Sequence, residues 1–204
     1  MGLDKLTVST KPVTTMMWLI PLMYLCIAVL IMLGGEAGKE LLRYDRVWIG
    51  QGEAWRFISG HMTHLGWSHL ALNGAGLLLV WYLVGGTFTN HAWLVIIGVT
   101  LATIDIAFWF RNPELYWYVG MSGLLHGLLA AGIVAQLRKL NAETVILLLL
   151  LSAKIAWEQW NGPVPGSEST SGGPVIVDAH LYGALGGVLG ALLARIRVKP
   201  PTSI

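Results

Sequence analysis

Charged residues are scarce in this chain. Of its 204 residues only 12% are Asp, Glu, Lys or Arg, whereas 55% are hydrophobic. This composition excludes an ordinary soluble domain and predicts a membrane protein with several spans in the lipid bilayer. The net charge of +2 is not gathered into a basic patch or arm, which argues against nucleic acid as a partner. Because no linker rich in Pro and Ser divides the chain, we expect a single membrane domain over residues 1–204.

Cysteine is nearly absent as well. Cys26 is the only cysteine and lies in an apolar run, which excludes an intramolecular disulfide and a metal site built from cysteines. The His-Glu-x-x-His signature of metalloproteases is missing. The histidines that are present lack a carboxylate ligand at a suitable spacing. We therefore expect neither a metal nor another cofactor.

Long apolar runs, by contrast, are abundant. A membrane-spanning helix needs ~20 mainly apolar residues, and six stretches qualify: 16–33, 68–84, 92–110, 116–135, 144–160 and 177–194. The predicted fold class is therefore all-α, a polytopic bundle of six transmembrane helices. An even number of spans places both termini on one side. The basic residues near the termini and between spans 4 and 5 make that side cytoplasmic: Lys5, Lys11, Arg138, Lys139, Arg195, Arg197 and Lys199.

Two connections have special features. The first, residues 34–64, carries four basic residues on the predicted outer side, interleaved with four acidic ones. We interpret it as a folded, partly interfacial segment. The connection 161–176 has no Lys or Arg and is rich in Gly, Pro and Ser, so it should be flexible. It would lie over the start of span 6, either as a lid or as a plain connector.

A candidate nucleophile lies in Gly120-Met121-Ser122-Gly123, within the fourth apolar run. A buried hydroxyl costs free energy unless it finds a partner, although serine in a membrane helix often only packs or bonds its own backbone. A possible partner is His180, at the start of span 6. Serine with histidine is the pattern of a nucleophile and its general base. No acid clearly completes a triad, although Asp178 is close enough in sequence to tune the base.

The polar residues of three spans fall in one layer. Spans 2, 4 and 6 all run from outside to inside, and His69 with Asn73, Ser122, and His180 lie near their beginnings. If span 4 is helical throughout, Ser122 lies roughly 9 Å below its outer end. Such a layer also supplies candidate donors for an oxyanion, namely His69, Asn73 and the Ser122 backbone N–H.

A stripe of small residues predicts which helices touch. His180 is followed on one face of span 6 by Gly183, Gly187 and Ala191, and span 4 offers small residues such as Gly127. Small residues at this spacing let two helices approach closely. Close packing of spans 4 and 6 would bring the imidazole to the hydroxyl.

Together these residues resemble the rhomboid family of intramembrane serine proteases. The motifs that carry the resemblance are Trp55-Arg56, His64, His69 and Asn73, Gly120-x-Ser122-Gly123, and Ala179-His180-x-x-Gly183. The resemblance implies a peptide-bond hydrolase with six core helices and a site that opens to the outside. It implies Ser122 and His180 as the catalytic dyad, with His69, Asn73 and Gly123 binding the oxyanion or the substrate.

One departure from the family pattern points to a branch. Bacterial rhomboids usually carry Tyr four residues after the serine, where this chain has His126. Together with Lys154-x-x-x-Glu158-Gln159 and the compact six-span chain, this is similar to the rhombosortase branch. That resemblance implies a bacterial inner-membrane enzyme with a periplasmic site, acting on membrane-anchored proteins whose C-terminal tail carries Gly-Gly. His126 would stack on His180, shift its pKa, or only pack.

Other readings remain open. A rhomboid-like protein without activity would serve in binding or quality control. A transporter would use Asp105, Lys154 and Glu158 as a relay. Lys154 and Glu158 are four residues apart, so they are more simply interpreted as neutralising one another or as holding span 5 to the first loop.

Overall fold

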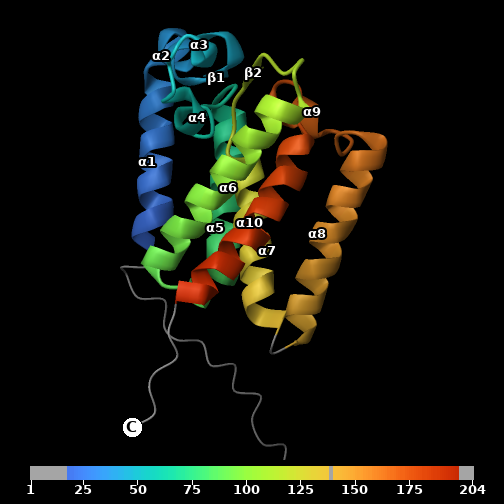
Figure 1. Ribbon diagram of the computed structural model, residues 1–204. Coiled ribbons are helices and arrows are strands. Elements are labelled where there is room, and N and C mark those ends of the chain that lie inside the picture. The colour runs from blue at the N-terminus through green and yellow to red at the C-terminus, as the bar shows by residue number, and fades with distance from the viewer. Residues whose placement is uncertain (1–17, 138–139, 198–204) are drawn as a thin grey trace, which may run out of the picture.

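The computed structural model describes residues 18–137 and 140–197, which are mostly helical. The predicted helical fold class is confirmed. The long helices are α1 (Leu19–Leu33), α5 (Trp67–Val84), α6 (Asn90–Arg111), α7 (Ser122–Gln136), α8 (Ala142–Asn161) and α10 (Asp178–Arg197). Helices α1, α6 and α8 run toward one end of the bundle, and α5, α7 and α10 run back from that end (Figure 1). The starts of these last three helices therefore lie together.

The number of membrane spans stays a prediction. Within the described part of the chain, two helices are long and apolar enough to cross a bilayer: α5 with the turn after it (Trp67–Thr87), and α6. Helices α1 and α7 and residues Asp178–Ala194 of α10 are apolar but shorter. The orientation also stays a prediction, because most of its basic residues lie outside the described part of the chain: Lys5, Lys11, Arg138, Lys139 and Lys199.

The fourth apolar run differs from its prediction at its beginning. Helix α7 begins at Ser122, and the residues before it are extended, with a strand β2 at Trp117–Tyr118. β2 pairs antiparallel with β1, Tyr44–Asp45. Gly120 has a φ of +121°, a conformation that ends regular structure and favours glycine. The expected depth of Ser122 along a helix is therefore wrong, since no helical turn precedes it.

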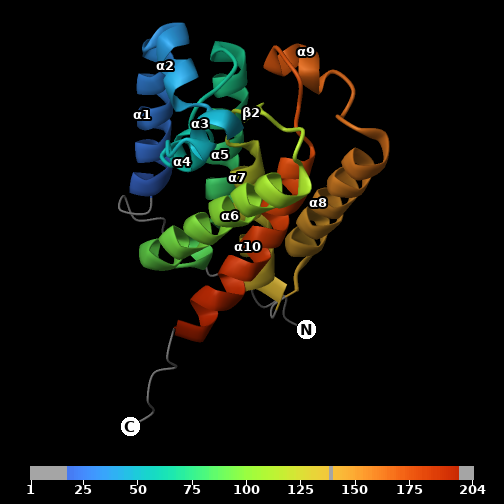
Figure 2. The same ribbon diagram turned by 45° about the horizontal axis from the view of Figure 1, so that its top comes forward.

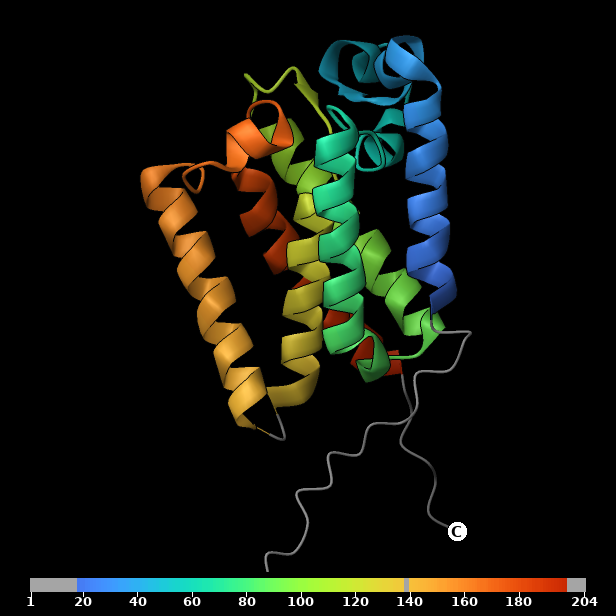
Figure 3. The same ribbon diagram turned by 180° about the vertical axis from the view of Figure 1, so that it is seen from behind.

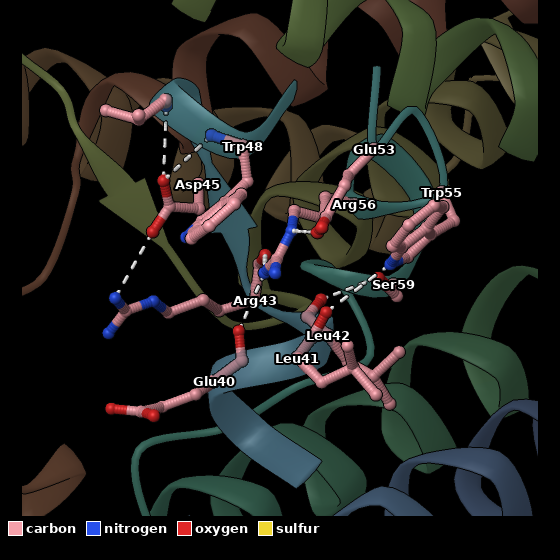
Figure 4. Close-up of polar contacts among 11 residues, drawn as sticks. Glu40, Leu41, Leu42, Arg43, Asp45, Trp48, Glu53, Trp55, Arg56 and Ser59 are labelled. Carbon is pink, nitrogen blue, oxygen red and sulfur yellow. Dashed lines mark hydrogen bonds and ion pairs between the residues drawn. The ribbon is translucent and has the colours of Figure 1, made fainter. Parts of the chain in front are cut away.

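The first loop is folded, as interpreted from its charges. Helices α2 (Gly35–Leu42), α3 (Arg46–Gly50) and α4 (Arg56–Ser59) gather at the end of the bundle where α7 and α10 begin (Figures 1 and 2). Arg56 is only 4% exposed. Its guanidinium donates to the carbonyls of Glu40 and Arg43 and lies 2.6 Å from Glu53 Oε2 (Figure 4). Arg56 thus ties α4 to the end of α2.

Helices α7 and α10 touch through their backbones. A β-carbon on Gly183 would lie 1.9 Å from the Gly123 carbonyl oxygen, and one on Gly187 would lie 1.9 Å from that of Gly127. These distances are far below van der Waals contact, so only glycine fits at positions 183 and 187 of α10. The predicted close packing of spans 4 and 6 is confirmed. Helix α8, in contrast, stands at the edge of the bundle (Figures 1 and 3).

The connection between α8 and α10 contains a short helix, α9 (Ser167–Ser171). Glycines with positive φ, Gly166 and Gly172, flank it on both sides. α9 lies at the end of the bundle where α10 begins (Figure 2). The connection is therefore not irregular throughout, and it lies over the predicted site.

Candidate active site

Ser122 and His180 meet at the starts of two touching helices. Ser122 is the first residue of α7 and His180 the third residue of α10. His180 Nε2 lies 2.9 Å from Ser122 Oγ, and His180 is only 4% exposed. The structure thus brings together the two residues predicted as a dyad. This distance suits transfer of the hydroxyl proton to the imidazole, and their catalytic role stays a prediction.

A carboxylate from a third helix contacts the other ring nitrogen of His180. Glu158, on α8, is 2% exposed, and its Oε2 lies 2.7 Å from His180 Nδ1. Its other oxygen lies 2.5 Å from Lys154 Nζ. Because a carboxylate only accepts, Nδ1 carries the proton and Nε2 keeps the lone pair that faces Ser122. Lys154 Nζ is also 3.4 Å from Nδ1, but the shorter Glu158 contact sets this assignment.

Sequence reasoning missed Glu158 as the partner of His180 and named Asp178 instead. The Asp178 carboxylate accepts a hydrogen bond at 2.6 Å from Asn112, the residue that follows α6. Lys154 and Glu158 neutralise one another, the first of the two roles considered for them, and Glu158 also contacts His180. One signal was available: Glu158 lies near the end of span 5, in the same layer as Ser122 and His180.

His126 stacks on His180, one of the roles considered for it. The ring centroids are 4.1 Å apart and the planes differ by 15°. His126 Nδ1 donates to the Ser122 carbonyl at 2.7 Å. With Glu158, these histidines offer ligand atoms within 4.8 Å of one another. Ring nitrogens bind metals in the ring plane, however, and nearly parallel planes do not converge on one ion. The cluster suits proton transfer better than metal binding.

The start of α5 supplies hydrogen-bond donors on the other side of Ser122. The backbone N–H of Leu65 donates to His69 Nδ1 at 3.3 Å, so the proton of a neutral His69 is on Nε2. Asn73 Nδ2 is buried and has no hydrogen-bond partner among the described residues. A β-carbon on Gly120 would lie 3.1 Å from His69 Nε2 and 3.9 Å from Asn73 Nδ2. Both donors therefore lie close to the chain that leads into Ser122.

His64 and Tyr118 lie outside the spans and contact His69 and Gly120. Burial, with the nearby His69 as a further cause, lowers the pKa of His64 to about 3, so His64 is neutral. Its Nδ1 donates to the Met62 carbonyl at 3.1 Å, and its ring meets that of His69 edge-on at 5.0 Å. Burial also raises the pKa of Tyr118, whose hydroxyl donates to the Gly120 carbonyl at 2.7 Å.

A cavity of about 560 Å³ joins both sides of the site. Ser122, His126, His180, His69 and Asn73 all line it. The connection that contains α9 lines it as well, through Val164, Pro165, Ser167, Thr170, Val175 and Ile176. The expected position of this connection over the site is therefore observed. Whether it moves as a lid stays a prediction.

Gly123 has a different environment from its predicted neighbours. It is not among the residues that line this cavity. A β-carbon there would lie 2.8 Å from the Ala179 carbonyl oxygen, so the contact observed for Gly123 is with α10. Packing against α10 is therefore enough to explain why glycine follows Ser122. A role of Gly123 in substrate binding stays a prediction.

Asp105 lies apart from the cavity. Its carboxylate is 3.1 Å from His61 Nε2, and both residues are buried. Tyr24 donates to the backbone carbonyl of His61. A relay through Asp105, Lys154 and Glu158 would need contact between these groups, but Asp105 pairs with His61. The pair binds α6 to the first loop.

Comparison with known protein families agrees with this geometry. A family model described as the rhomboid domain matches residues 51–197, well over half of the chain. No curated protein matches the chain. The chain belongs to the rhomboid family, whose members are integral membrane proteins and generally serine proteases that act on membrane protein substrates in the bilayer.

Proposed function

We propose that this protein is an intramembrane serine endopeptidase with Ser122 as nucleophile and His180 as general base. The observation that carries the proposal is the 2.9 Å contact between Oγ and Nε2. Oγ bonds to the substrate carbonyl carbon while its proton moves to Nε2. That proton then passes to the leaving amine as the carbon–nitrogen bond breaks, and water hydrolyses the acyl-enzyme.

The oxyanion would be bound by donors at the starts of α5 and α7. Asn73 Nδ2 is buried without a partner, and His69 carries its free proton on Nε2. The first backbone N–H groups of α7, beginning at Ser122, have no acceptor within the helix. The positive end of the α7 dipole also favours negative charge there. Donors oriented in advance toward the developing charge are the usual source of stabilisation in acyl transfer.

The proposed substrate is a protein with a single-span C-terminal tail that carries Gly-Gly, as the resemblance to rhombosortases implies. A regular helix cannot present its carbonyls to Ser122 because they are bonded within the helix. The tail must therefore unwind near the site. Glycine lowers helix stability by up to ~1 kcal/mol relative to alanine and lets the chain approach a crowded site. The enzyme would act in the bacterial inner membrane with its site toward the periplasm and its termini in the cytoplasm.

A serine-directed fluorophosphonate probe tests the proposed chemistry. Purified protein in detergent should be labelled, and Ser122→Ala and His180→Ala should lose the label and the cleavage of a tailed reporter. Ser152→Ala is the matched control, since Ser152 is exposed on α8. Failure of the wild-type protein to react, or labelling that survives in Ser122→Ala, would favour an inactive binding or quality-control protein.

A second experiment tests the substrate class. The reporter tail is expressed with its Gly-Gly intact or replaced by Leu-Leu or Val-Val, together with the wild-type protein or Ser122→Ala. We expect Ser122-dependent cleavage of the Gly-Gly tail and little cleavage of the others. Undiminished cleavage of the Leu-Leu and Val-Val tails would defeat the Gly-Gly requirement while leaving the protease intact.

A further inference from the structure

We propose that Glu158 is a positioning residue that holds His180 in the tautomer and orientation needed by the base, and that Lys154 holds Glu158. This inference rests on the proposed function and deepens it. It turns the pair Ser122 and His180 into a chain of four groups. In this chain each side chain fixes the next, and the residues come from three different helices.

The contacts form one continuous line. Ser122 Oγ is 2.9 Å from His180 Nε2, His180 Nδ1 is 2.7 Å from Glu158 Oε2, and Glu158 Oε1 is 2.5 Å from Lys154 Nζ. An imidazole with a single hydrogen bond can still turn about its ring axis. Bonds at both nitrogens, together with the His126 ring stacked on one face, leave His180 one orientation.

Glu158 would also stabilise the positive charge that forms on His180. When Nε2 takes the serine proton, the ring becomes a cation at a position that is 4% exposed. A buried cation is costly without a partner. The Glu158 carboxylate stabilises it through the Nδ1–H, and no proton needs to leave Nδ1. No other described acid is in place, because Asp178 bonds Asn112 and Asp105 bonds His61.

Lys154 explains how a carboxylate is tolerated there. An unpaired buried carboxylate is strongly unfavourable, whereas a paired and hydrogen-bonded one is acceptable. Glu158 is 2% exposed, while the Lys154 side chain is 39% exposed and reaches toward the cavity. Lys154 is one turn away on the same helix, so it orients the carboxylate by directing one oxygen to itself and the other to His180.

This arrangement predicts that glutamine is a poor replacement despite its similar shape. In Glu158→Gln the amide oxygen would face the Lys154 ammonium, since two donors repel. The NH₂ group would then face His180 Nδ1 and force the proton onto Nε2, the wrong tautomer for a base. Removing the lysine as well, in Lys154→Met with Glu158→Gln, frees the amide to turn its oxygen to the Nδ1–H. The double variant should therefore be more active than Glu158→Gln alone.

The test measures kcat and KM for the Gly-Gly reporter in detergent. Glu158→Gln should lower kcat by roughly 10²–10⁴ with KM unchanged, as for loss of the acid of a soluble triad. Glu158→Asp should recover part of the loss, and the double variant with Lys154→Met should exceed Glu158→Gln. The control is Glu143→Gln, the same change at an exposed position at the other end of α8.

A kcat of Glu158→Gln equal to that of Glu143→Gln would overturn the inference. A loss of kcat that is fully explained by a smaller fraction of folded Glu158→Gln protein would overturn it as well. If Glu158→Gln does not fold, ¹⁵N NMR of histidine in the wild-type protein decides. The His180 signal, assigned by its loss in His180→Ala, should show the Nδ1–H tautomer, and the Nε2–H tautomer would refute the inference. Failure of the proposed function is distinct, because either the wild-type protein would then not cleave the reporter or Ser122→Ala would still cleave it, and the His180 tautomer can be read in both cases.

Discussion

Two polar clusters face each other across the cavity, and they differ in how their hydrogen bonds are satisfied. In the first, the groups that link Ser122, His180 and Glu158 all bond one another. In the second, at the start of α5, Asn73 Nδ2 is buried without a partner in the described part of the chain. A buried donor without an acceptor costs about 1–3 kcal/mol. The first cluster is complete at rest, and the second has unused donors.

This difference fits the order of events in acyl transfer. The base must be oriented before the substrate arrives, whereas the oxyanion exists only once the carbonyl has been attacked. Interactions made only with that developing charge raise the rate without tightening the binding of the ground state. The unpaired Nδ2 donor of Asn73 is therefore the kind of unfavourable feature that a catalytic site retains.

The largest effect should come from breaking the satisfied cluster at its centre. His180→Ala removes the partner of both Ser122 and Glu158, so reporter cleavage should fall by roughly 10⁴-fold or more. Initial rates at saturating reporter measure it. His91→Ala is the control, because His91 is exposed near the other end of the bundle. Near-normal cleavage by His180→Ala would contradict the catalytic role assigned to the first cluster.

The second cluster should give a smaller and different effect. Asn73→Ala removes a donor that has no protein partner, so the folded protein should lose no internal hydrogen bond and little stability. It should lower kcat by roughly 10²–10³, the cost of one oxyanion donor, with KM nearly unchanged. Michaelis curves for Asn73→Ala and wild type separate the two constants. A rise in KM at constant kcat would instead assign Asn73 to substrate binding.

The distance between the clusters can be changed through the helix contact. Gly183→Ala places a methyl group against the Gly123 carbonyl and must move α10 away from α7. We expect about 1–3 kcal/mol of lost stability from overpacking. A shift of about 1 Å at the site can cost roughly 10²-fold in activity. Thermal unfolding and reporter cleavage report both, with Gly98→Ala as control because nothing lies within 4 Å of a β-carbon there.

The smallest effect is expected at His126. In His126→Tyr an aromatic ring still stacks on His180, although the hydrogen bond to the Ser122 carbonyl is lost. Cleavage should therefore persist at a reduced rate, whereas His126→Ala should lose more. Parallel rate measurements on the two variants make the comparison. Complete loss in His126→Tyr would show that the imidazole itself takes part in the chemistry.

Apolar runs and polar layers in the sequence were sufficient to predict the long helices and to select Ser122 and His180 as candidates that the structure brings together. A run of apolar residues reports directly on burial in lipid, and a serine or histidine within it requires a partner. The stripe of Gly183 and Gly187 also predicted the partner helix, because only small residues permit such close packing. These features depend on local composition and helical period, which can be read without coordinates.

Other features depended on contacts between distant segments. Helix α7 begins at Ser122 because β2 pairs with β1 and Gly120 turns the chain, and apolar composition does not distinguish that extended segment from a helix. The acid beside His180 is Glu158 rather than Asp178 because α10 is rotated so that Asp178 faces Asn112, the residue after α6. Sequence determined which ionisable groups lie in the layer of the site. Only the tertiary structure decided which of them touch, because helix rotation and cross-helix distance are set by packing across the whole bundle.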